Sequence, residues 1–97
     1  METHAKVVVI GGGVVGCSIL FHLAKFGLKD CILLERNELT SGSSWHAAGS
    51  VHAISSDPNI SKLMAYTIKL YKEIEETSGH SVGFKPSGGF YLASNEV

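Results

Sequence analysis

The chain has 97 residues, of which 44% are hydrophobic, which predicts a folded globular segment of one domain at most rather than a disordered chain. Eight lysines and arginines are balanced by nine aspartates and glutamates, and the formal net charge is -1. This balance, without a basic run, excludes the electrostatic footprint of nucleic-acid or anionic-membrane binding, and we expect neither partner.

The first half of the sequence predicts one parallel crossover unit. Residues 6–10 contain the β-branched run VVVI, which is typical of a strand buried on both faces, and three glycines end it. Apolar residues at helical spacing then predict a helix over residues 14–26, with Gly27 placed for a left-handed C-terminal cap. Residues 30–35 (DCILLE) form a second short apolar run, so the order is strand, helix, strand.

The second half predicts a long loop, a helix and a hairpin. Residues 37–57 are rich in serine and glycine, and a connection of this length is more often functional than idle. A helix is expected over residues 58–78, with Asp57 as its N-cap and Gly79 as its stop. Residues 82–93 (VGFKPSGGFYLA) show two strand patterns around a Pro-Ser-Gly-Gly turn, which predicts a hairpin.

A glycine pattern joins the first predicted strand to the first predicted helix. Gly11, Gly13 and Gly16 form GxGxxG, and Glu35 follows about 20 residues later at the end of the next strand. This context is typical of dinucleotide binding. The first glycine permits the tight turn, the second lets backbone approach a diphosphate, and the third lets the helix pack closely on the strand.

The start of that helix and the acid after the second strand suit the two ends of an ADP moiety. Free amides around Val14 and Val15 favour a diphosphate anion. Glu35 would accept hydrogen bonds from ribose hydroxyls, and its charge would oppose a 2′-phosphate, which favours FAD or NAD over NADP. The fingerprint does not choose between FAD and NAD.

The cysteines and histidines predict no metal site. Cys17 and Cys31 lie in apolar contexts without a CxxC spacing. The five histidines lack zinc-ligand spacing with cysteine or carboxylate partners. Two isolated thiols also predict no disulfide framework, which fits a reducing compartment.

The apolar run over residues 7–24 imitates a signal peptide or a membrane span. Three consecutive glycines and His22 interrupt it, and no arginine-rich transit sequence precedes it. Because METHAK runs straight into the predicted strand, we expect a cytoplasmic protein. A processed or truncated chain of the mitochondrial matrix is the alternative.

The stretch SGSSWHAAG, residues 41–49, follows the second predicted strand, near the edge where open α/β sheets bind ligands. Its small residues allow backbone to pack against a flat ring system. Taken alone, His46 is either an ordinary loop histidine or a neighbour of a ligand, and Trp45 is a plug that covers the loop.

The segments VVVIGGGVVGCSILFHLAKFG, CILLER, LTSGSSWHAAG, KLYKEIEETSG and GGFYLA together resemble the N-terminal flavin domain of the dimethylglycine and sarcosine dehydrogenases, over essentially all 97 residues. These enzymes are a branch of the D-amino-acid-oxidase-like flavoproteins. The resemblance implies an α/β, Rossmann-like FAD-binding domain. Residues 1–97 would be its incomplete N-terminal part, and the hairpin over 82–93 would begin the substrate-domain sheet.

The resemblance also implies a cofactor site. It implies that His46 carries FAD covalently, through a bond from an imidazole nitrogen to the methyl carbon on the benzenoid ring of the flavin, and that Trp45 walls the pocket. The expected cofactor-binding residues are Gly11, Gly13, Val14, Val15, Gly16, Glu35, Arg36, Gly42, Ser43, Ser44, Trp45, His46, Ala47, Ala48, Gly49 and Ser50.

The implied activity is oxidation of the carbon–nitrogen bond of an N-methylated glycine, with hydride passing to the flavin. The electron acceptor is left open between oxygen and an electron-transfer flavoprotein, and tetrahydrofolate would bind only in a C-terminal part outside this chain. No catalytic residue is expected within residues 1–97, since His80 and Lys85 flank turns. Two alternatives stay open: a non-catalytic regulatory subunit, similar to that of pyruvate dehydrogenase phosphatase, and an NAD-linked dehydrogenase.

Overall fold

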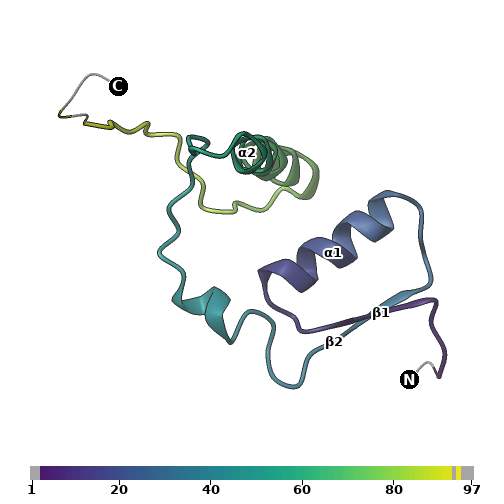
Figure 1. The fold of residues 1–97 in the computed structure, drawn as a ribbon. Coiled ribbons are helices and arrows are strands. Elements are labelled where there is room, and N and C mark those ends of the chain that lie inside the picture. The colour runs from purple at the N-terminus through teal and green to yellow at the C-terminus, as the bar shows by residue number, and fades with distance from the viewer. Residues whose placement is uncertain (1–2, 93, 95–97) are drawn as a thin grey trace. The chain divides into compact units, whose positions relative to one another are not determined.

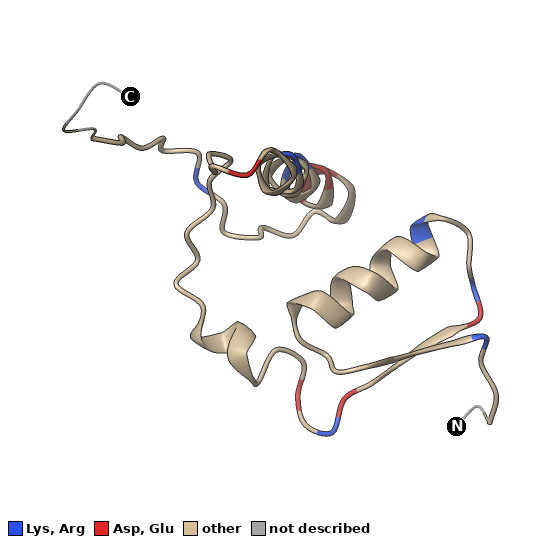
Figure 2. Cartoon of the chain, viewed as in Figure 1, with Lys and Arg blue, Asp and Glu red and all other residues tan. Residues whose placement is uncertain are grey.

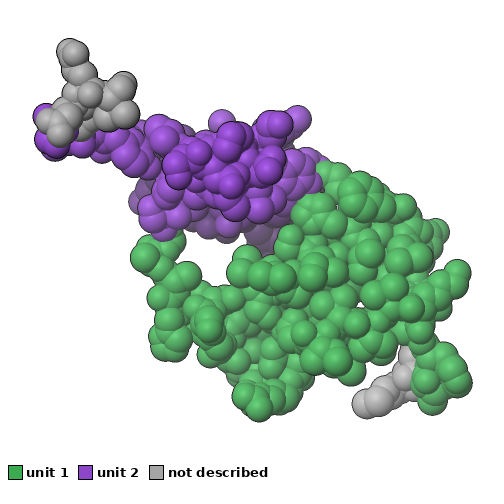
Figure 3. All heavy atoms as spheres, viewed as in Figure 1, with its two compact units in different colours: residues 1–49 green, residues 50–97 purple. Residues whose placement is uncertain are grey.

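The computed structural model describes residues 3–92 and residue 94. It separates into two compact units, Met1–Gly49 and Ser50–Val97 (Figure 3). The elements in chain order are β1 (Val7–Ile10), α1 (Val14–Lys25), β2 (Cys31–Leu34), η1 (Ser43–His46) and α2 (Pro58–Ser78) (Figure 1). The predicted α/β order of strand, helix and strand is confirmed.

The first unit is built on a two-stranded parallel sheet. β1 pairs with β2 in a register that runs from Val7 opposite Cys31 to Ile10 opposite Leu34. The amide of Gly11 donates to the carbonyl of Leu34 at 2.8 Å and extends the pairing by one residue. Because the strands are parallel, their carboxyl ends lie at one edge of the sheet, where the glycine turn after β1 meets the chain after β2.

α1 forms the crossover between the two strands and lies along the sheet (Figure 1). It begins at Val14, directly after the glycines, and ends at Lys25, one residue before the predicted end. The amide of Leu28 donates to the carbonyl of Leu23 at 2.9 Å, and Gly27 has a φ of 91°. The predicted left-handed cap is therefore confirmed.

The contact between α1 and β1 depends on Gly16, which is buried. A Cβ added at Gly16 would overlap the carbonyl oxygen of Gly11 and lie 3.5 Å from Cγ1 of Val9. Val9 is 8% exposed and fills the strand side of this contact. Only glycine allows the helix to approach the strand this closely, which is the role predicted for the third glycine of the pattern.

The second unit is organised around α2. Asp57 caps its start, because Oδ1 accepts from the amides of Asn59 at 2.7 Å and Ile60 at 3.1 Å. Pro58 occupies the first turn, and Gly79, with a φ of 71°, follows the last. Both predicted ends of this helix are confirmed.

The hairpin predicted over residues 82–93 is not formed in the part of it that the structure describes. Residues 80–92 contain no strand, and residue 93 lies outside the described residues. Phe90 and Leu92 are each 99% exposed. An isolated two-stranded hairpin is marginally stable without a surface against which it packs, so the alternating pattern alone does not produce it.

Charged residues of both signs occur along the chain in each unit (Figure 2). Over residues 3–92 and 94, neither helix combines the length and the apolar character that a bilayer-spanning helix needs. Over the same residues, no group of three or more histidine, cysteine, aspartate or glutamate side chains comes together in a way that could hold a metal ion. Cys17 and Cys31 are free thiols.

Candidate cofactor site

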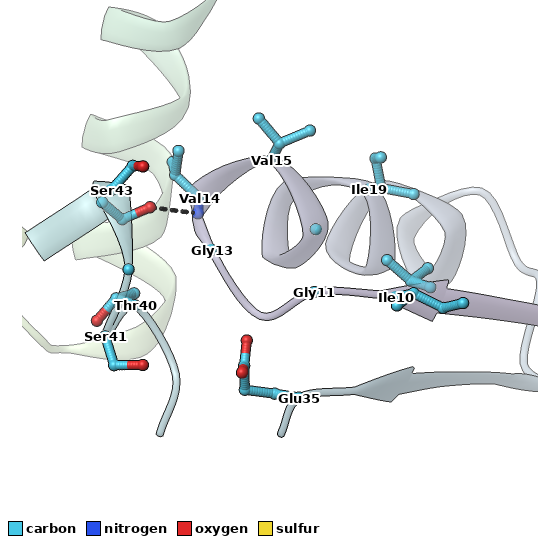
Figure 4. Close-up of a pocket in the computed structure, with 14 residues that line it drawn as sticks. Ile10, Gly11, Gly13, Val14, Val15, Ile19, Glu35, Thr40, Ser41 and Ser43 are labelled. Carbon is cyan, nitrogen blue, oxygen red and sulfur yellow. Dashed lines mark hydrogen bonds between the residues drawn. The ribbon is translucent and has the colours of Figure 1, made fainter. Parts of the chain in front are cut away.

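A cleft of about 460 Å³ opens at the carboxyl edge of the sheet in the first unit (Figure 4). The end of β1, the start of α1, the residue after β2 and the segment over residues 40–44 line it. Open α/β sheets bind ligands at this edge. The predicted cofactor residues that line the cleft are Gly11, Gly13, Val14, Val15, Gly16, Glu35, Gly42, Ser43 and Ser44.

The other predicted cofactor residues do not line this cleft. Arg36 lines a smaller adjoining cleft of about 340 Å³, to which Glu35 also contributes. Residues 45–49 line neither of these clefts, and Ser50 belongs to the second unit. A part for these residues in cofactor binding stays a prediction.

The glycine turn forms one side of the cleft. Gly11 has a φ of 105°, a backbone conformation that favours glycine. Gly12 is a variable position of GxGxxG, so the motif gave it no role. A Cβ added at Gly12 would lie 2.6 Å from Cδ2 of Leu39 and 3.0 Å from Cβ of Glu35. The run of three glycines was the available signal, because its middle member has no room for a side chain although the motif leaves that position variable.

The start of α1 faces the cleft, and a residue distant in sequence caps it. The N-cap residue, Gly13, has no side chain to accept a hydrogen bond. The amide of Val14 donates instead to Oγ of Ser44 at 2.9 Å, shown as the dashed line in Figure 4. The positive end of the helix dipole therefore lies at a cleft whose lining includes the glycine backbone and the hydroxyl groups of residues 40–44, beside valine and isoleucine side chains.

Backbone amides bind both carboxylate oxygens of Glu35, which points toward the glycine turn (Figure 4). Its Oε2 accepts from the amide of Gly12 at 2.7 Å, and its Oε1 from the amide of Asn37 at 3.0 Å. These hydrogen bonds, that from Asn37 first, lower the pKa of Glu35 from its ordinary value of 4.5. Sequence reasoning missed this role in the turn. A carboxylate has capacity for further donors, so a ribose contact stays compatible with it.

Replacing Glu35 by glutamine is expected to weaken the folded protein only where the carboxylate is charged. Because folding lowers the pKa, the stabilisation is present above pH 4.5 and is lost as the pH falls through the lower folded-state pKa. Urea unfolding from about pH 7 to about pH 3 measures it as the difference in unfolding free energy between wild type and Glu35→Gln. This difference should be constant near neutrality and shrink in acid.

The matched control for that titration is Glu38→Gln, because the carboxylate of Glu38 accepts no hydrogen bond from the residues that the structure describes. The difference in unfolding free energy between wild type and Glu38→Gln should not show the decrease in acid that is expected for Glu35→Gln. A Glu35→Gln difference that grows as the pH falls would contradict the assignment.

The segment after β2 is held against the glycine turn. The amide of Thr40 donates to the carbonyl of Gly12 at 2.8 Å. Thr40 has a φ of 64°, which is uncommon for a β-branched residue. Thr40 and Ser41 line the cleft but were not among the predicted cofactor residues. Ser41 begins the SGSSWHAAG stretch, which was the available signal, whereas Thr40 becomes distinctive only through its tertiary contacts.

Trp45 and His46 lie in η1, the short 3-10 turn that ends this segment. Trp45 is 77% exposed, so within this chain it does not plug the loop, and it does not line the cleft. Its part in walling the flavin pocket stays a prediction. His46 is also exposed, and its imidazole is therefore accessible to a ligand that extends beyond the cleft.

Comparison with known proteins relates this geometry to a family. A model of the family "FAD dependent oxidoreductase" (DAO) matches residues 6–97. The chain is 48% identical over 96 residues to the mitochondrial dimethylglycine dehydrogenase of Homo sapiens. It is 45% identical over 96 residues to the mitochondrial sarcosine dehydrogenase of Homo sapiens, and 33% identical over 96 residues to the mitochondrial pyruvate dehydrogenase phosphatase regulatory subunit of Mus musculus.

These alignments cover nearly all of this chain but only a small part of each relative. They cover 99%, 98% and 99% of this chain, in the same order, but 11%, 10% and 11% of the three relatives. The chain therefore spans about a tenth of the length of the curated relatives it matches.

Proposed function

This chain belongs to the family of FAD-dependent oxidoreductases, and on that premise we propose that it holds the FAD-binding part of a dehydrogenase that oxidises the carbon–nitrogen bond of an N-methylated glycine. One observation carries the proposal. The glycine turn, the start of α1 and the Glu35 carboxylate line a single cleft. Together these groups suit the diphosphate and the ribose of an ADP moiety.

The residues present fit FAD. Gly13 lines the cleft with bare backbone. An added Cβ at this position would lie 3.2 Å from Oγ of Ser44, so a larger residue would crowd the cleft. The amide of Val14 is not free as predicted, because it donates to Oγ of Ser44, but the positive end of the α1 dipole still attracts a diphosphate. Glu35 retains acceptor capacity for ribose hydroxyls. The negative charge of Glu35 opposes a 2′-phosphate. When bound, FAD supplies a ring system that accepts a hydride, while the protein supplies its orientation and its electrostatic surroundings.

We propose His46 as the point of covalent FAD attachment, through a bond between an imidazole nitrogen and the methyl carbon on the benzenoid ring. A neutral imidazole is a nucleophile near pH 7, and a partner held beside it reacts at high effective concentration. The new bond would replace one methyl C–H bond and the imidazole N–H bond, and the two electrons left on the flavin ring would pass to the electron acceptor. The exposure of His46 and its place in the same short turn as the cleft-lining Ser43 and Ser44 support this role. His46 thus holds the cofactor and takes no part in hydride transfer.

The relatives support the proposed substrate class. Dimethylglycine and sarcosine are N-methylated glycines, and the dehydrogenases named for them are 48% and 45% identical to this chain. We assign no catalytic residue within this chain. The groups that hold the substrate, and any site for tetrahydrofolate, are proposed to lie outside residues 1–97.

The test is a spectrum of the whole gene product after purification. We expect the absorption bands of an oxidised flavin, and bleaching of those bands when dimethylglycine or sarcosine is added without oxygen. A colourless protein would contradict the flavin assignment and favour the NAD-linked alternative. A yellow protein that neither amine bleaches would contradict the substrate class.

A regulatory role is the second candidate, and one observation favours it. The chain is 33% identical over 96 residues to a protein named as a regulatory subunit. That role predicts a protein whose flavin, if present, is not reduced by N-methylated glycines. The bleaching measurement therefore separates the two candidates.

The location of the protein is proposed from the same relatives. All three names place those proteins in mitochondria. They support the mitochondrial matrix as the location and give no support to the cytoplasmic one expected from the sequence.

A further inference from the structure

Two hydrogen bonds attach the segment over residues 40–44 to the glycine turn and to α1. At the start of the segment, the amide of Thr40 donates to the carbonyl of Gly12 at 2.8 Å. At its end, Oγ of Ser44 accepts from the amide of Val14 at 2.9 Å. The segment between these two points lines the cleft (Figure 4). Its position is therefore set by the same backbone that is proposed to receive the diphosphate.

The bond made by Ser44 spans 30 residues of sequence and compensates for a missing group. Gly13, the N-cap residue of α1, has no side chain, so an orphan amide at the start of the helix needs a partner from elsewhere. Ser44 supplies it. Ser43, its neighbour in the same turn, makes no side-chain hydrogen bond within the part of the chain that the structure describes.

Ser44 and His46 share one short turn. The amide of Trp45 donates to the carbonyl of Gly42 at 3.2 Å, and the amide of Ala47 to the carbonyl of Ser44 at 3.4 Å. Among the described residues, the bond from Val14 to Ser44 is the one hydrogen bond that joins this turn to α1. A displacement of Ser44 therefore displaces the imidazole two residues later.

We propose that Ser44 is a positioning residue for His46. By binding the start of α1, Ser44 holds the η1 turn at a fixed place relative to the proposed diphosphate site. FAD held by its ADP end then meets an imidazole that is already in place. This inference rests on the proposed attachment at His46, and it adds a residue that contacts neither of the bonding atoms.

The test follows attachment in the whole gene product, produced without flavin and then mixed with FAD. The rate at which flavin becomes stable to acid precipitation should fall about tenfold or more in Ser44→Ala, because small misplacements of a reacting group cost up to about 100-fold. In Ser44→Ala, the dissociation constant for FAD before attachment should change by a smaller factor than the attachment rate does. Ser44→Thr keeps the hydroxyl and should restore the rate to within about threefold of wild type. Ser56→Ala, the control, removes an exposed serine hydroxyl that lines neither cleft and should match wild type.

The outcomes separate this inference from the proposal on which it rests. An unchanged attachment rate in Ser44→Ala would overturn the positioning role and leave the attachment at His46 intact. Acid-stable flavin in His46→Ala would instead overturn the attachment.

Hydrogen exchange of the flavin-free protein supplies a second readout that does not depend on attachment. In Ser44→Ala, the amides of Val14, Trp45 and Ala47 should exchange faster than in wild type, because the turn has lost its bond to α1. Ser43→Ala should leave them unchanged. Equal exchange in Ser44→Ala and wild type would overturn the inference whatever the outcome for His46.

Discussion

Replacing Gly16 by alanine is expected to destabilise the protein by about 3 kcal/mol and to abolish its binding of FAD. The added Cβ would overlap the carbonyl oxygen of Gly11, a backbone atom that cannot rotate away as a side chain does. α1 would have to move off β1, and the glycine turn that lines the cleft would move with it. Urea unfolding and the flavin content of the purified variant measure the two effects.

Gly89→Ala is the matched control for that substitution. Gly89 has no atom within 4 Å of an added Cβ, and its φ is not among the positive values. The same chemical change there should leave both stability and flavin content near those of wild type. If Gly16→Ala kept wild-type stability and flavin content, the close approach of α1 to β1 would not be a requirement of the fold.

Replacing His46 by alanine is expected to remove all acid-stable flavin. No other imidazole is proposed to lie at the flavin, so no residual attachment should remain. The ADP end would still bind, because the glycine turn and Glu35 are unchanged by the substitution. The variant should therefore be yellow when purified and should release all of its colour on acid precipitation, whereas wild type should retain the colour in the pellet.

His52→Ala is the control for the loss of an exposed histidine from the same loop. The ring of His52 makes a local contact, 3.1 Å from Nδ1 to the carbonyl oxygen of Ile54. The variant should keep its flavin attached. Release of colour from wild type, or retention of colour in His46→Ala, would contradict the proposed attachment.

Much of the first unit could be predicted because its signals are local. A β-branched run, three glycines, a helical apolar pattern and an acid after the next strand each constrain a few neighbouring residues, and together they predict a parallel crossover. The ends of α2 could be predicted equally well, because Asp57 and Gly79 cap the helix to which they are adjacent in sequence. Local steric and hydrogen-bonding preferences are the part of folding that a sequence displays most directly.

The remainder depended on contacts between distant positions. Nothing near Ser44 shows that it caps a helix 30 residues earlier, and nothing near Glu35 shows that an amide of Gly12 binds it. The hairpin failed for the related reason that strand patterns need a partner surface, and Phe90 has none among the described residues at 99% exposure. Trp45 does not plug its loop, because burial of a large side chain requires neighbours that a sequence does not reveal.

The cleft draws every one of its lining residues from the stretch between Val9 and Ser44. Loop-closure entropy grows with the length of chain between two contacts, so a site assembled from such near neighbours costs little entropy to close. Synthesis proceeds from the amino end, and domains fold in that direction as they emerge. The groups proposed to bind the ADP moiety are therefore all synthesised before any residue of α2.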